Sequence, residues 1–112
     1  MEYWLVAAEW WVDKLKPIPG HPDAKRNDVA NIAKISNLTH ILADSIKAEV
    51  EKWGDMIQPY SIDTTFDAGE PILTTALEKA DIKGAEFPSG VLMEISSKNV
   101  VVCERTVLYG EY

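Results

Sequence analysis

Residues 60–66 read YSIDTTF, and at this point the hydrophobic pattern of the chain changes its period. Bulky side chains at positions 60, 62 and 66 alternate with small or polar ones, as on a strand with one buried face. Before this segment, apolar residues recur every three or four positions, as on one face of a helix. We therefore expect a strand over about residues 57–66, preceded by a helical half.

Two helices are predicted in that first half. Residues 2–16 place Glu2, Glu9 and Asp13 on one helical face and aromatic or aliphatic side chains on the other. The PIPGHPD segment at 17–23 has three prolines, so we expect a loop there. A second helix over 28–53, capped by Asn27 or Asp28 and ended by Gly54, has its apolar stripe at Ile32, Ile35, Leu38, Leu42, Ile46, Val50 and Trp53.

After the strand, the pattern predicts one more helix and a hairpin. Pro71 suits the first turn of a helix over about 70–81, which Gly84 closes. Runs rich in β-branched residues at 91–96 and 100–109 flank a polar turn and predict two strands. The expected fold is α+β: two helices followed by strand, helix, strand, strand, in a single domain over 1–112 with a small three-stranded sheet.

The charge of the chain is strongly acidic. Its 112 residues have a formal net charge of −7, and most of the excess lies after Gly54. This disfavours direct binding to nucleic acid or to anionic membranes, which attract clustered Lys and Arg. Because no apolar run is long enough to span a bilayer and the first residues lack a basic signal-peptide start, we expect a cytoplasmic protein with no membrane association.

Sequence motifs for catalysis or metal binding are not found. His21 and His40 are far apart, the glycines are scattered singly, and there is one cysteine. We therefore predict no catalytic residue, no cofactor and no metal site. Cys103 lies in a run of valines, and we expect it to be a buried structural thiol. His21 and Asp23, in the proline-rich loop, could orient a ligand or simply keep the loop polar.

Two groups of residues form the predicted binding surface. Asp63, Asp67 and Glu70 gather carboxylates where the first strand leads into the third helix; they could act as acid and base, but the helix dipole explains them without a substrate. Tyr3 and Trp10 extend the apolar arc of the first helix beyond what one core is expected to cover. We therefore expect a homo-oligomer, a dimer paired through this helix.

Short motifs across the chain suggest a family. They are WWVDKL at 10–15, ALEKADIKG at 76–84, Phe87-Pro88, MEI at 93–95, VVV at 100–102 and YGEY at 109–112. With these motifs the chain resembles a group of small uncharacterised proteins of bacteriophage and prophage genomes. The resemblance implies an accessory protein that binds a host factor without turning over a substrate, and it brings no catalytic residue with it.

Three functions remain open on this basis. The first is a non-enzymatic protein that engages or inhibits a host protein through an acidic or aromatic surface, with a basic partner as the expected target. The second is an oligomeric protein that binds or sequesters a small ligand such as a nucleotide, because tryptophans can stack on bases. The third is an enzyme of unrecognised class, whose only candidate groups are the three carboxylates.

Overall fold

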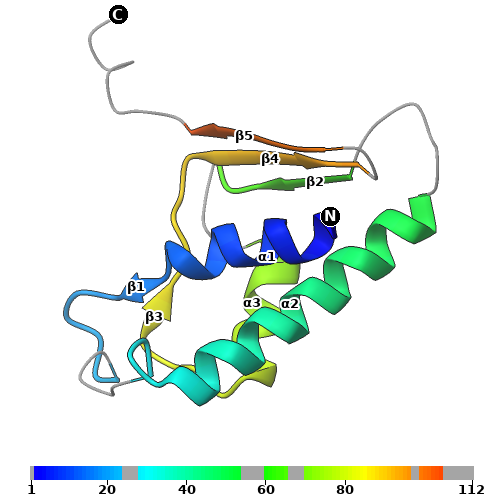
Figure 1. Cartoon of the computed structure of the whole chain (residues 1–112). Helices are drawn as coiled ribbons and strands as arrows, with labels where there is room; N and C mark the ends of the chain where they lie inside the picture. Colours follow the sequence, from blue (N-terminus) through cyan, green and yellow to red (C-terminus); the bar gives the residue numbers. More distant parts are fainter. Residues whose placement is uncertain (1, 24–27, 54–59, 66–69, 97–98, 105–112) are drawn as a thin grey trace, which may run out of the picture.

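A three-stranded antiparallel sheet forms one side of the molecule, and all the helices lie on the other side (Figure 1). The computed structural model describes residues 2–23, 28–53, 60–65, 70–96 and 99–104. The predicted α+β class is confirmed, with three helices in the described part. The order of elements differs from the prediction because a second, two-stranded sheet of very short strands is also present.

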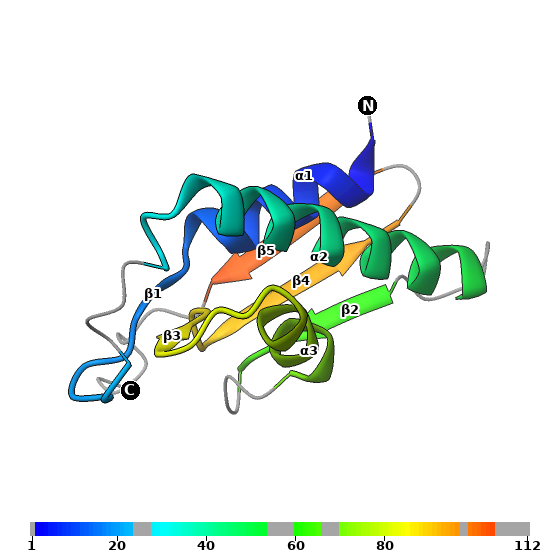
Figure 2. The same cartoon turned by 90° about the horizontal axis from the view of Figure 1, so that it is seen from below.

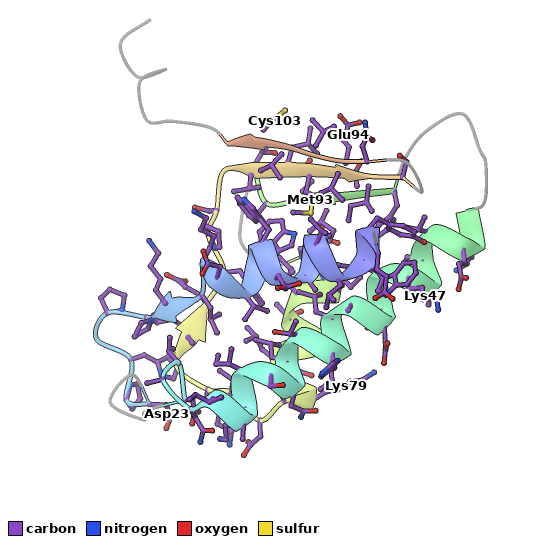
Figure 3. The ribbon with its side chains drawn as sticks, in the orientation of Figure 1. Asp23, Lys47, Lys79, Met93, Glu94 and Cys103 are labelled. Carbon is purple, nitrogen blue, oxygen red and sulfur yellow. The ribbon has the colours of Figure 1, made fainter. Side chains whose placement is uncertain are left out.

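The strands of the larger sheet are β2 (Tyr60–Asp63), β4 (Val91–Ile95) and β5 (Val100–Glu104), in the order β2-β4-β5. Ile62, Met93 and Val102 are directly opposite one another in the register, so they share one face. That face is turned to the helices, and Met93 is fully buried. Figure 3 shows Met93 on the helix side of the sheet and Glu94 and Cys103 on the opposite side.

The helix α1 (Tyr3–Asp13) lies under β4 and β5 and is crossed by α2 (Ile32–Trp53), which also packs on α3 (Pro71–Lys79) (Figure 2). Trp11 is the centre of the core: it is fully buried, and its indole Nε1–H donates to Met93 Sδ over 3.1 Å. Its ring also meets Phe87 edge to face at 6.1 Å. Burying such a side chain contributes on the order of 2–3 kcal/mol.

The start of α2 differs from the prediction. The helix begins at Ile32, where the Lys34 N–H donates to Asn31 Oδ1 over 3.1 Å, so Asn31 and not Asp28 provides the cap. Asp28 is instead buried and accepts hydrogen bonds from Lys34 Nζ (3.0 Å) and from the Lys83 N–H (3.3 Å). Ile32, predicted in the apolar stripe, is 84% exposed, because it occupies the first turn and the packed face begins only at Ile35.

The two shortest strands were not predicted. β1 (Lys16–Pro17) pairs antiparallel with β3 (Ala85–Glu86), within segments expected to be a helix end and loops. Consequently α1 ends at Asp13 and not near residue 16. Two residues are too few to show an alternating pattern, and Pro17 argues against a strand except at an edge. The expected strand ends at 57–59, 66 and 105–109 lie outside the described residues.

Cys103 is exposed, so the prediction of a buried thiol is wrong. In a strand successive side chains point to opposite faces, and Cys103 falls on the outward face together with Val101, which is 43% exposed. A run of apolar residues therefore did not mean a strand buried on both sides. Among the described residues, no helix combines the length and hydropathy that crossing a membrane requires.

Candidate functional site

A cleft with acidic walls lies where α2, β2 and α3 meet, and we call it the acidic cleft. Its volume is about 440 Å³. The residues that line it are Ser45, Ala48, Glu49, Tyr60, Glu70, Pro71, Ile72 and Thr75. Three elements that are distant in sequence therefore bring two carboxylates and a phenol together.

The pKa of Tyr60 reflects the electrostatic environment of the acidic cleft. Partial burial raises the pKa of its hydroxyl well above the usual 10.0, and the nearby Glu49 and Glu70 carboxylates raise it further. Desolvation and neighbouring negative charge both disfavour the phenolate. The negative potential of the two carboxylates, which adds to the larger effect of burial on Tyr60, favours a positive group in the cleft.

The predicted carboxylate group is divided by the structure. Glu70 precedes α3 and lines the acidic cleft, and its side chain does not cap the helix. Asp63 serves the end of β2, where its Oδ1 accepts hydrogen bonds from the N–H (2.8 Å) and hydroxyl (2.6 Å) of Thr65. Asp67 lies outside the described residues. Glu49 and Tyr60 were missed, because their proximity depends on how α2 crosses β2.

A second cleft, of about 210 Å³, has aromatic and basic walls, and we call it the aromatic-basic cleft. It is lined by Trp10, Lys14, Lys16, Pro88, Ser89, Gly90 and Val91. The Lys14 ammonium lies 5.5 Å from the Trp10 ring centroid, within cation–π range. Trp10 itself meets the buried Trp11 edge to face at 5.1 Å.

The two predicted aromatic residues are not brought together. Tyr3 lies near the start of α1, edge to face with Trp4 at 4.7 Å, and its pKa is raised by partial burial and by Glu51. Both Tyr3 and Trp10 are half-buried and pack against the core. One core therefore covers more of α1 than the sequence argument allowed, and a dimer through this helix stays a prediction.

The histidines do not form a site in the described part. His21 Nδ1 accepts the backbone N–H of Asp23 over 3.0 Å, which holds a local turn. His40 is exposed on α2. Within the described ranges, no group of three His, Cys, Asp or Glu side chains could hold a metal ion.

No family model, no curated protein and no solved structure matches this chain.

Proposed function

We propose that this chain is a non-enzymatic binding protein, encoded by a phage or prophage, that engages a host protein by receiving one of its basic side chains in the acidic cleft. The observation that carries the proposal is the convergence of Glu49 and Glu70 on Tyr60. An arginine or lysine of a partner would exchange solvent for two carboxylates and a phenol oxygen.

The chemistry of the cleft matches such a guest. A guanidinium has five N–H donors, and the acidic cleft offers the carboxylate oxygens of Glu49 on α2 and Glu70 just before α3, with hydroxyls on Ser45 and Thr75. The partner's aliphatic stem would have Ala48, Pro71 and Ile72 to lie against. The net charge of −7 adds a long-range attraction that speeds association with a basic protein.

The test uses an arginine-rich peptide and a double variant, Glu49→Gln with Glu70→Gln. The matched control, Glu9→Gln with Asp13→Asn, also removes two carboxylates, both exposed on α1. At low salt we expect the double variant to bind the peptide at least about tenfold more weakly, since charge-assisted hydrogen bonds are lost. The control should stay within about twofold.

The same variants extend the test to a natural partner. A host protein captured from lysate by the wild type and by the control, but not by the double variant, would identify the target. Equal weakening of peptide binding by the control and by the double variant would contradict the proposal, because the two remove the same charge and binding would then follow total charge and not the cleft. An unaffected double variant would contradict it as well.

A further inference from the structure

The aromatic-basic cleft has chemistry opposite to that of the chain as a whole. Lys14 and Lys16 lie in one cleft of a protein whose net charge is −7. In the described part of the chain, neither ammonium is in an ion pair with a carboxylate. Two lysines that line one cleft, with neither in an ion pair among the described residues, favour an anion there.

Trp10, the aromatic wall of this cleft, is supported by packing against the core. Trp10 packs on Trp11, and Trp11 is fixed by its hydrogen bond to Met93 and its contact with Phe87. A ring that is already immobilised loses little conformational entropy when a ligand stacks on it. Trp10 is only half-buried, so part of its surface remains open to the cleft.

The opposite wall is the loop that joins β3 to β4, and Thr64 holds it in place. The fully buried Thr64 donates its hydroxyl to Pro88 O (2.9 Å) and accepts the Val91 N–H (3.1 Å). The Gly90 N–H donates to Thr64 O over 2.7 Å. Gly90 has a φ of +75°, which other residues rarely adopt, so the turn that shapes this wall favours glycine.

We propose that the aromatic-basic cleft binds a flat ring that carries a single phosphate, with a nucleoside monophosphate as the ligand class. The base stacks on Trp10 in place of the Lys14 ammonium, which lies 5.5 Å from the ring centroid in the free protein, and the phosphate is bound by Lys14 and Lys16. The Ser89 hydroxyl is a further hydrogen-bond partner.

The size and surroundings of the cleft support a ligand of this kind. An adjoining cleft of about 400 Å³ shares Lys16, Pro88 and Ser89 with it and leaves room for a ribose beside the ring. Glu86 lines that second cleft and is opposite Lys16 in the β1–β3 register. Glu86 does not line the aromatic-basic cleft itself, but its carboxylate would repel further phosphates that extend into the adjoining cleft, which is why we propose one phosphate and not three.

The proposal is tested by amide and indole chemical shifts of the whole chain titrated with AMP, adenosine or inorganic phosphate at low salt. AMP is expected to shift the Trp10 indole and the Ser89 and Gly90 amides. Adenosine, which lacks the phosphate, and phosphate, which lacks the ring, should each bind at least about tenfold more weakly. Saturation at these residues by AMP alone supports the proposal.

Variants locate the two halves of the ligand. Lys14→Met with Lys16→Met should weaken AMP at least about tenfold and leave adenosine unchanged, whereas Trp10→Leu should weaken both. Lys52→Met with Lys79→Met removes two exposed lysines that do not line this cleft, so it is the control and should bind as the wild type does. The proposal is overturned if AMP at millimolar concentration shifts none of the cleft resonances, or if the double lysine variant binds AMP as the wild type does.

Discussion

The acidic cleft and the aromatic-basic cleft differ in charge and in how their walls are supported. The acidic cleft is formed by exposed or half-buried side chains of α2, β2 and α3. The aromatic-basic cleft rests directly on the core, through Trp11 behind one wall and Thr64 behind the other. The difference shows that a net charge of −7 for the whole chain does not determine the local charge of an individual surface cleft. It also indicates which site a core substitution will disturb.

The largest effect is expected from Trp11→Ala. Removing a fully buried tryptophan should lower the free energy of unfolding by about 3–5 kcal/mol. If the protein remains folded, the aromatic-basic cleft should lose its backing while the acidic cleft keeps its shape. Urea unfolding followed by circular dichroism measures the loss. Trp11→Phe keeps a ring but not the N–H to Met93 and should cost less; an equal cost for both would contradict the role assigned to the ring.

Thr64→Val should have the next largest effect, because it leaves the Val91 N–H and Pro88 O without their buried partner. We expect about 1–3 kcal/mol of destabilisation. Hydrogen exchange of the Val91 amide should speed up by more than that of amides in α2. Thr64→Ser retains the hydroxyl and serves as the control. A valine variant as stable as the wild type would show that these hydrogen bonds do not hold the wall.

Tyr60 gives a pH-dependent test of the acidic cleft. Its pKa in the folded protein is raised above 10.0, so the phenol keeps its proton where the unfolded chain would lose it. The stability it contributes is therefore full below pH 10.0 and declines as the pH rises above that value. Phenolate absorbance should show the pKa of Tyr60 falling towards its usual value in Glu49→Gln. In Glu9→Gln it should not move, and a shift there would mean that distant charges set it.

The smallest effect is expected on the outward face of the sheet, away from both clefts. Cys103→Ser should change the free energy of unfolding by less than about 0.5 kcal/mol, because the side chain is exposed. A thiol reagent should modify Cys103 in the native protein at a rate close to that of a small free thiol. Slow modification of the folded protein would show that this face is covered in solution.

The sequence predicted the larger elements because each contains enough residues to show its period. α2 and α3 lie where the apolar stripes indicated, and β4 alternates as a half-buried strand should. The pair β1–β3 has two residues a strand and no period to detect. The cap was misplaced because Asn27, Asp28 and Asn31 are all good capping residues. Asn27 lies outside the described residues, and Asp28 is used instead by Lys34 and by the N–H of the distant Lys83.

The candidate site was predicted only in part. Trp10 and Glu70 were singled out, and each lines a cleft. Their partners Lys14, Lys16, Glu49 and Tyr60 were not, because ionisable groups become a site only through tertiary contacts. Asp63 was singled out for its charge, but its carboxylate is used by Thr65 two residues away. Local turn chemistry and a functional carboxylate look alike in a sequence.

The Met93 thioether that accepts the Trp11 hydrogen bond lies in the core, so its oxidation can be used to detect opening of the core. The thioether of Met93 is fully buried, so peroxide can reach it only when the sheet separates from α1. The rate at which Met93 becomes a sulfoxide, followed by peptide mass, would therefore report the population of states in which the sheet has separated from α1 under native conditions. Once formed, the polar sulfoxide would not fit between Trp11 and the sheet, so each oxidation event would leave a lasting chemical record of an opened core.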